Sequence, residues 1–578
     1  MKQLKQLFLP FSLLLLLSSC GLFGIHVNLH NPRKPGKYPH FSKETILLGE
    51  LTPIRKNFGV TFYDLDITID PSAKTVGGWV EVKATALKDI DSIQLDLDQP
   101  LAIEQLKWKT REGENLKYSR RYRAVFIQLN QKIKQGESFS VHIKYSGKPV
   151  IARKPPWSGG MVWKKDKLGN NFDGVVCETD GASVWFPCKD HTSDEPDSAR
   201  LKFTIPDTNL FVVSNGNFIG SEKTNNSKSF TWKISYPINV YNITFYMGDY
   251  AKIEDTCTGI NSKELKLNYY VLKPNVNRAR QHFQQVKQVI HTYEELYGEY
   301  PWYNDGYKLI ESPYKGQEHQ TAIAYGNGFV NDLYKKDDYI ILHETGHEWF
   351  GNAVTAADLS DVWLQEGFTT YGEALFLEKK YGKETAINHL LNYRIFIKNK
   401  LPVVGPVGRR YFDYHDEDVY TKGAWILNTL RNTINNDSVF FTIIKSFYQE
   451  NKLKMITSSA FIQTVNRITG KDYNWFFNQY LYKNEVPVME GDYGSDGAFY
   501  YRWTNVPEEF NKLPVHLRLG SDSNTLTIFP NSKVQKVDIP LNANGSYPAI
   551  NFYITKTLYI SIMNKKMKSI YDNQQNTK

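Results

Sequence analysis

The chain has 578 residues and a formal net charge of +9 at pH 7, and it is 41% hydrophobic and 23% charged. This length predicts several domains with ample apolar material for buried cores. With only four cysteines, the composition excludes a small disulfide-stabilised scaffold. Basic and acidic residues are mixed along the chain, apart from a short lysine cluster at residues 565–568, so the charge does not predict a nucleic-acid partner.

The first twenty residues have the pattern of a bacterial lipoprotein signal. Two lysines precede an apolar run over residues 7–17, which is too short to span a bilayer and is typical of a signal peptide. The Leu-Ser-Ser-Cys sequence that ends at Cys20 matches the lipobox, where residues 1–19 are removed and the cysteine is acylated. The alternative is an ordinary secretory signal with an incidental thiol at Cys20.

Lipidation at Cys20 would attach several acyl chains and hold the protein stably on a membrane. Residues 20–50 contain several prolines and are predicted to be a tether. We therefore expect a protein of a bacterial cell envelope, anchored by lipid to the outer membrane, with its folded part outside the cytoplasm.

Residues 51–255 are predicted to form a β domain. Between Asp64 and Asp70, the apolar residues Leu65, Ile67 and Ile69 alternate with polar ones, as in a half-buried strand. Turn-forming residues recur between such runs, which favours an antiparallel sandwich or a saddle-shaped sheet.

The remainder of the chain changes its periodicity twice. Apolar residues at helical spacing begin near Arg278, so residues 256–488 are predicted to be a mostly helical domain. Strand patterns return in residues 489–570, which predicts a small β domain, and residues 571–578 are predicted to be a polar, disordered tail. The fold class that follows is multidomain α+β.

The sequence His-Glu-Thr-Gly-His at residues 343–347 carries the strongest chemical signal. On a helix, His343 and His347 project from one face and can share a metal ion, with Glu344 beside them. Glu366 follows His347 by nineteen residues, enough to end one helix and bring a carboxylate from a second. Two histidines and one glutamate leave a fourth position for water, which is the catalytic arrangement of zinc, one ion per chain. A surface helix with two histidines at this spacing is the alternative, but the apolar flanks indicate a buried helix, in which such groups must be paired or metal-bound.

His-Glu-x-x-His-x-Trp-Phe-Gly-Asn, together with Trp-Leu-x-Glu-Gly-Phe around Glu366, resembles the aminopeptidase N-type gluzincins, which include the leukotriene hydrolase branch. The resemblance covers residues 60 to 488. It implies a thermolysin-like catalytic zinc domain that removes N-terminal residues from peptides. Glu344 would be the general base. Tyr420, in a Tyr-x-Lys-Gly segment, would be the donor that stabilises the oxyanion.

One motif of that family is altered here. The family has Gly-x-Met-Glu-Asn, whereas this chain has Gln317 at the methionine position, Glu318 at the glutamate and His319 at the asparagine. The resemblance implies that Glu318 binds the α-amine of the substrate, and that Glu178, on the loop before Phe-Pro-Cys, is a second amine contact. An extended substrate is expected to pair with a short strand predicted over residues 321–326.

Two other functions fit the sequence. One is an endopeptidase, or a different hydrolase on the same scaffold, which would have no need of an amine anchor at Glu318. The other is a non-catalytic, peptide-binding surface lipoprotein.

The sequence does not decide whether Cys177 and Cys188 form a disulfide. It also leaves open the preferred first residue of the substrate and the oligomeric state.

Overall fold

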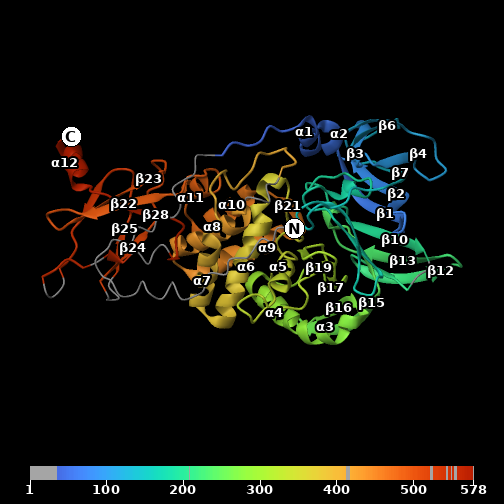
Figure 1. Ribbon diagram of the computed structural model, residues 1–578. Helices are drawn as coiled ribbons and strands as arrows, with labels where there is room; N and C mark the ends of the chain where they lie inside the picture. Colours follow the sequence, from blue (N-terminus) through green and yellow to red (C-terminus); the bar gives the residue numbers. More distant parts are fainter. Residues whose placement is uncertain are drawn as a thin grey trace, which may run out of the picture. The chain divides into compact units, whose positions relative to one another are not determined.

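The computed structural model describes residues 36–206, 209–411, 417–520, 525–541, 545–548, 550–551 and 556–576. These residues form two compact units (Figure 1). The first consists of residues 36–484 and 556–558, and the second of the other described residues from 485 onward. The predicted signal peptide and Cys20 lie outside the described residues.

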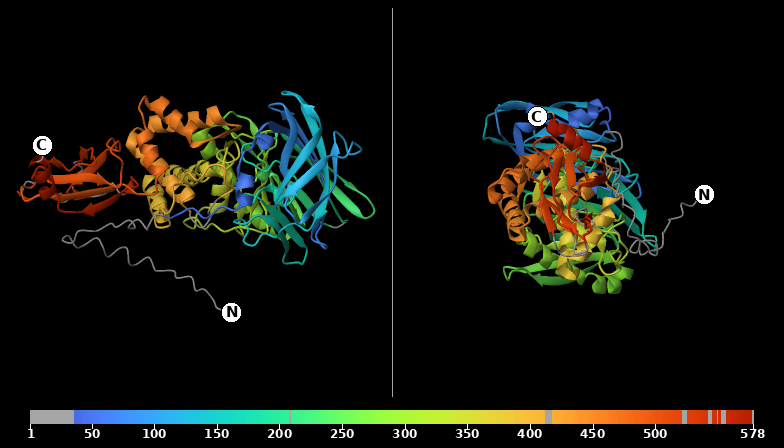
Figure 2. Two further views of the ribbon diagram at one scale, coloured as in Figure 1. Left: turned by 90° about the horizontal axis from the view of Figure 1, so that it is seen from above. Right: turned by 90° about the vertical axis from the view of Figure 1, so that its left-hand side faces the viewer.

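The first unit begins with a β domain, as predicted. Its largest sheet has seven strands in the order β12-β13-β10-β1-β2-β7-β4 and is drawn from blue to green in Figures 1 and 2. The bounds are β1 Phe58–Asp70, β2 Thr75–Ala86, β4 Leu101–Trp108, β7 Ser138–Gly147, β10 Ser198–Pro206, β12 Asn217–Lys223 and β13 Ser227–Ile234. Leu65, Ile67 and Ile69 of β1 are fully buried, which confirms the predicted alternation.

Two smaller sheets pack into the same hydrophobic core. One contains β3 Ile90–Asp96, β6 Ala124–Ile133 and β5 Lys117–Arg121, and the other contains β11 Phe211–Ser214, β14 Phe245–Gly248, β9 Asn171–Val176 and β8 Gly160–Lys165. A short 3-10 helix, Ala182–Val184, follows β9. Cys177 and Cys188 are both buried free thiols, so the disulfide left open by the sequence is not formed.

The tether was predicted to reach residue 50, and this is wrong for its last part. Helix α1, Lys43–Gly49, is capped by the Ser42 hydroxyl, which accepts from Thr45 N at 3.0 Å. In the next helix, α2 Pro53–Lys56, Arg55 is fully buried and donates to Asp96 Oδ2 at 2.7 Å. Arg55 also donates to Leu48 O of α1, and Gly49 O lies 3.2 Å from His191 Nε2, so α1 is part of the folded unit.

A five-stranded sheet follows, in the order β15-β16-β17-β19-β18. The bounds are β15 Tyr250–Thr258, β16 Glu264–Leu272, β17 Tyr307–Glu311, β18 Gly316–Gln317 and β19 Ile323–Tyr325. Because β15 pairs with β16 along its whole length, this sheet begins before the expected boundary at residue 255. The strand predicted for substrate pairing, β19, is already paired on both sides. On this side of the sheet β18 is the edge strand. An extended chain could therefore pair with β18 and not with β19.

The rest of the first unit is mostly helical (green to orange in Figure 2). They are α3 Val276–His282, α4 Gln285–Tyr297, α5 Tyr339–Gly346, α6 Trp363–Tyr381, α7 Lys383–Arg394, α8 Asp418–Ile434, α9 Asp437–Asn451, α10 Ser458–Thr469 and α11 Asn474–Tyr480. A short parallel pair, β20 Val354–Ala356 and β21 Lys454–Ile456, lies among them. Among the described residues, no helix combines the length and the apolar character needed to cross a bilayer.

The second unit is a small β structure, as predicted. One sheet has the order β26-β23-β22-β28 and the other the order β25-β24-β27. The bounds are β22 Val488–Tyr493, β23 Phe499–Thr504, β24 Val515–Leu519, β25 Thr525–Ile528, β26 Gln535–Val537, β27 Ile550–Asn551 and β28 Ser561–Asn564.

The predicted disordered tail is wrong for residues 571–576, because helix α12 spans Lys568–Asn576. Lys568 pairs with Asp572 at 2.7 Å across one turn, and the Tyr571 ring meets the edge of Tyr500 at a centroid distance of 5.2 Å. Polar composition in this segment therefore marks the exposed face of a docked helix.

Candidate active site

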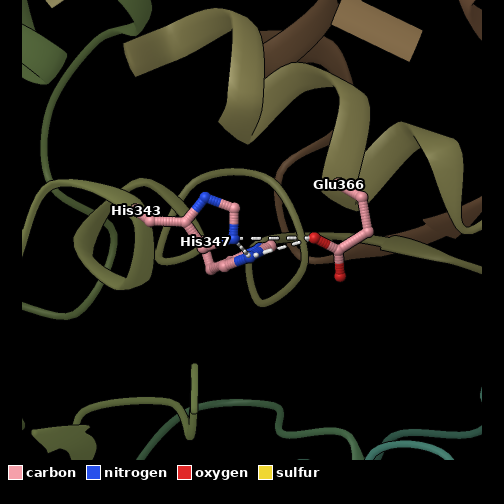
Figure 3. A group of neighbouring side chains, drawn as sticks. All are labelled: His343, His347 and Glu366. Carbon is pink, nitrogen blue, oxygen red and sulfur yellow. Dashed lines mark hydrogen bonds and ion pairs between the residues drawn. The ribbon is translucent and has the colours of Figure 1, made fainter. Parts of the chain in front are cut away.

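Helices α5 and α6 bring three predicted ligands together. The Asp338 side chain caps α5 by accepting from Ile340 N at 2.9 Å. The helix ends at Gly346, and His347 follows with helical backbone angles (φ −63°, ψ −20°), so both imidazoles stay on one face. His343 Nε2 and His347 Nε2 lie 3.2 Å apart, and Glu366 Oε2, from the first turn of α6, lies 3.7 Å and 3.4 Å from them (Figure 3).

The donor set of these three residues fits one zinc ion. His343 Nδ1 donates to Glu373 Oε1 at 2.7 Å, and His347 Nδ1 donates to Phe350 O at 3.0 Å, so both Nε2 lone pairs are left for a metal. Glu366 Oε2 is buried and accepts no hydrogen bond from the described part of the chain. Two imidazole nitrogens and one carboxylate oxygen, without a thiolate, are the ligands of catalytic rather than structural zinc.

Glu373, which orients His343, was not predicted from the sequence. Glu373 is fully buried, two turns after Glu366 on α6, and it accepts three hydrogen bonds. Besides His343, His389 Nε2 donates to its Oε2 at 2.8 Å, and the Tyr393 hydroxyl donates to the same oxygen at 2.8 Å. His389 and Tyr393 are four residues apart and therefore share a face of α7. The spacing between Glu366 and Glu373 was a signal that could have identified this glutamate.

Glu373→Gln should weaken zinc binding by about 10- to 100-fold, because outer partners of a ligating histidine fix its orientation and basicity. The amide keeps one acceptor oxygen but has an NH2 donor in place of the other, so it cannot accept from His343 on one side and from His389 and Tyr393 on the other. Competition with a chromogenic chelator measures the zinc dissociation constant. Glu378→Gln is the matched control, since Glu378 lies on the same helix and pairs with Arg431 away from the site. An unchanged zinc affinity in Glu373→Gln would contradict the assigned role.

Two glycines allow α6 and α8 to cross closely beside the ligands. A Cβ atom built at Gly367 would lie 3.0 Å from Gly423 Cα, and one at Gly423 would lie 2.8 Å from Gly367 Cα. This close approach brings Tyr420, in the first turn of α8, to the metal ligands, and its ring stacks on His343 at a centroid distance of 6.3 Å. Burial raises the pKa of the Tyr420 phenol well above its usual value, as do the Glu366, Glu178 and Glu318 carboxylates. Tyr420 therefore keeps its proton.

Gly423→Ala should lower the free energy of unfolding by about 1–3 kcal/mol, because the added methyl group forces the two helices apart. Catalytic turnover should fall with it, since Tyr420 moves away from the ligands. Calorimetry should show the transition of the first unit a few degrees lower. Gly220→Ala on β12 is the control, because a Cβ atom there meets nothing within 4 Å. Equal melting temperatures for both variants would count against the helix-crossing argument.

A cavity of about 250 Å³ opens next to the three ligands. Its floor includes Glu344, and burial raises the pKa of that carboxyl group to about 7. Gly316 of β18 leaves the space that Glu344 occupies, since a Cβ atom at this position would lie 2.4 Å from Glu344 Oε1. Aromatic side chains form another part of the wall, namely Trp157, Tyr339, Tyr393 and Phe396. The cavity thus joins the three ligands, the Glu344 carboxyl group and an aromatic surface.

Two further glutamates line this cavity, Glu178 from the loop after β9 and Glu318 directly after β18. Burial raises the pKa of both carboxyl groups, and the charge of Glu318 raises that of Glu178 further. Gln317 Nε2 donates to Glu178 Oε2 at 2.9 Å and also to Glu318 Oε2. His319 instead turns into the core, where its Nδ1 lies 2.7 Å from the Tyr246 hydroxyl and burial lowers its pKa to about 3. One cavity therefore brings together all seven predicted zinc-site and substrate-site residues: His343, Glu344, His347, Glu366, Tyr420, Glu318 and Glu178.

Two histidines of a His-Glu-x-x-His sequence and a glutamate from the next helix are the ligand set of the His-Glu-x-x-His class of zinc proteins. Comparison with known families then gives the family itself. The Peptidase family M1 domain matches residues 319–480, and the Peptidase M1 N-terminal domain matches residues 60–241. Together they cover more than half of the chain, which belongs to peptidase family M1.

Individual relatives are distant. Aminopeptidase N of Haemophilus influenzae is 24% identical over 59% of this chain and 42% of its own length, and aminopeptidase B of Mus musculus is 26% identical over 76% of this chain and 67% of its own. The chain thus spans about two fifths of the aminopeptidase N relative. An M1 zinc metallopeptidase structure from Deinococcus radiodurans superimposes with a TM-score of 0.63 at 20% identity, covering 74% of this chain and 94% of that one. At this level of identity, the structural likeness shows a shared fold and nothing further.

Proposed function

We propose that this protein is a zinc-dependent aminopeptidase, which releases single amino acids from the N-termini of peptides. The observation that carries the proposal is the pair of carboxylates, the half-buried Glu178 and the buried Glu318, in the same cavity as the metal ligands. A protonated N-terminus needs acidic partners when it leaves water, whereas an internal peptide bond offers no cation to them. The names of the relatives, aminopeptidase N and aminopeptidase B, support the same activity.

The roles of the residues follow from their chemistry. Zinc held by His343, His347 and Glu366 would polarise the scissile carbonyl and lower the pKa of water. Glu344 accepts a proton from the attacking water molecule and delivers it to the leaving amine. The Tyr420 hydroxyl donates a hydrogen bond to the carbonyl oxygen as negative charge develops there. Glu318 and Glu178 hold the α-ammonium group and so set the first peptide bond against Glu344.

Hydrolysis of aminoacyl anilides by the full-length protein tests this proposal. Each substrate is offered with a free and with an acetylated N-terminus, in the presence and absence of a zinc chelator. Chelator-sensitive cleavage of only the free-amine substrates is expected, and the panel then ranks the preferred first residue. Cleavage of acetylated peptides would establish an endopeptidase instead. Zinc binding without cleavage of any substrate would favour the peptide-binding lipoprotein.

Tyr420→Phe should lower kcat by about 10²- to 10³-fold, because one oxyanion donor is lost from a site with little water. The Michaelis constant should change little, since the hydroxyl acts mainly in the transition state. Steady-state kinetics on the best anilide substrate measures both parameters, and metal analysis checks that zinc is retained. A raised Michaelis constant with unchanged kcat would instead make Tyr420 a ground-state binding residue.

We also propose that the protein is a lipoprotein of a bacterial cell envelope, anchored at the outer membrane through Cys20 and acting on peptides outside the cytoplasm. The support is the lipobox at the end of the apolar run. Metabolic labelling with an alkyne fatty acid should mark the wild-type chain and not Cys20→Ala, whereas Cys257→Ala should be labelled normally. Labelling of Cys20→Ala at the wild-type level would rule out this anchor.

A further inference from the structure

Gln317 replaces a methionine of the family motif, and its side chain lies at the centre of the predicted amine site. Pairing of β18 with β19 fixes its backbone opposite Ala324. The side chain is only 2% exposed, and so is that of Glu318. A buried amide at this place must be explained by its hydrogen bonds.

The amide group of Gln317 connects the two glutamates. Its Nε2 has two N–H donors, and both are used, one on Glu178 Oε2 at 2.9 Å and one on Glu318 Oε2. The opposite orientation of the amide would turn its oxygen toward two carboxylates, which is repulsive. Gln317 therefore holds Glu318, its neighbour in the chain, together with Glu178, which lies 139 positions before Gln317.

Two oxygen atoms of this group lack a donor. Gln317 Oε1 and Glu318 Oε1 are both buried and accept no hydrogen bond from the described residues. Other buried acceptors of the described chain also lack a donor, but these two belong to neighbouring residues that line the cavity beside the metal ligands. An α-ammonium group brings three N–H donors, which these two oxygens and an oxygen of Glu178 could satisfy.

We propose that Gln317 is a third residue of the α-amine site. This proposal rests on the aminopeptidase function proposed above. Its Nε2 positions the carboxylates of Glu178 and Glu318, and its Oε1 accepts an N–H of the substrate ammonium group. A methionine at this position would have neither the donor nor a strong acceptor. The site thus recognises a primary ammonium group by two charges and one amide oxygen.

Two zinc-binding ligands test this inference on the full-length, zinc-loaded protein. Leucine hydroxamate carries the α-amine, and 4-methylpentanoyl hydroxamate lacks it but binds the metal in the same way. Calorimetric titration gives both dissociation constants, and their ratio reports the contribution of the amine. In the wild type this ratio should be about 100 or more. In Gln317→Met it should fall by about tenfold or more, the range expected for a lost hydrogen bond to a charged group.

The same titrations separate this inference from a structural role. Binding of the des-amino hydroxamate should stay within about threefold of wild type, which shows that fold and zinc are intact. Gln317→Leu serves if the methionine variant does not fold. Gln320→Met is the matched control, because Gln320 is a buried glutamine three residues away whose amide donates to Pro237 O at 2.9 Å. Its ratio should equal that of the wild type.

Two outcomes would overturn the inference. A large ratio in the wild type that is unchanged in Gln317→Met would leave the aminopeptidase proposal standing and remove Gln317 from the amine site. A wild-type ratio near one would refute both, since no part of the site would then recognise the amine.

Discussion

Glu344→Gln should abolish most of the turnover while leaving zinc bound. The carboxylate is not one of the three ligands, and glutamine has the same size, so the metal site keeps its geometry. The variant loses the group that moves the proton from water to the leaving amine, a contribution of about 10²- to 10⁴-fold to the rate. Steady-state kinetics with a free-amine anilide measures kcat, and metal analysis of the same sample measures zinc.

Glu344→Asp provides a graded comparison, because it keeps the charge but withdraws the carboxylate by one methylene group. Its kcat should lie between those of the wild type and Glu344→Gln. Full activity with stoichiometric zinc in Glu344→Gln would mean that another group is the base. Loss of zinc would instead mean that Glu344 supports the metal site, and kinetics alone could not make that distinction.

Local patterns in the sequence were sufficient for the parts of the fold that depend on neighbours in the chain. The alternation at Leu65, Ile67 and Ile69 predicted a strand, and these residues are fully buried in β1. The spacing of His343 and His347 predicted a shared face of one helix, which α5 provides. Both follow from fixed backbone periodicities. The family resemblance added Tyr420, whose place beside His343 depends on the helix crossing at Gly367 and Gly423.

Errors arose where a contact between distant segments decides the structure. The segment that includes α1 was predicted to be a tether because prolines precede it, but Arg55 donates both to Leu48 O of α1 and to Asp96 of the β domain. Residues 321–326 were predicted to be a strand that pairs with the substrate, and β19 does form there, but the order of the sheet places β18 at the edge. The role of Glu373 depends on His389 and Tyr393 of another helix. None of these pairings can be obtained from periodicity alone.

Glu318 has two hydrogen-bonding neighbours that determine how a substitution will act, one at its carboxylate and one at its backbone oxygen. Gln317 binds one of its oxygens, and the other has no donor among the described residues. Asn352 Nδ2 donates to the Glu318 backbone oxygen at 2.8 Å, so the main chain is held independently of the side chain. A substitution at Glu318 should therefore change the recognition of the amine without moving β18 or the cavity wall around it.

Glu318→Ala should lower kcat/KM for free-amine substrates by about 10²- to 10³-fold, because a buried carboxylate opposite an ammonium group contributes several kcal/mol. Most of the loss should be in KM, since the ammonium group does not take part in bond cleavage. Kinetics of matched free and acetylated anilides measures the effect. Glu417→Gln removes an exposed carboxylate from the same cavity and should keep kcat/KM within about threefold. An equal loss in both variants would mean that Glu318 acts only through the overall charge of the cavity and does not anchor the amine.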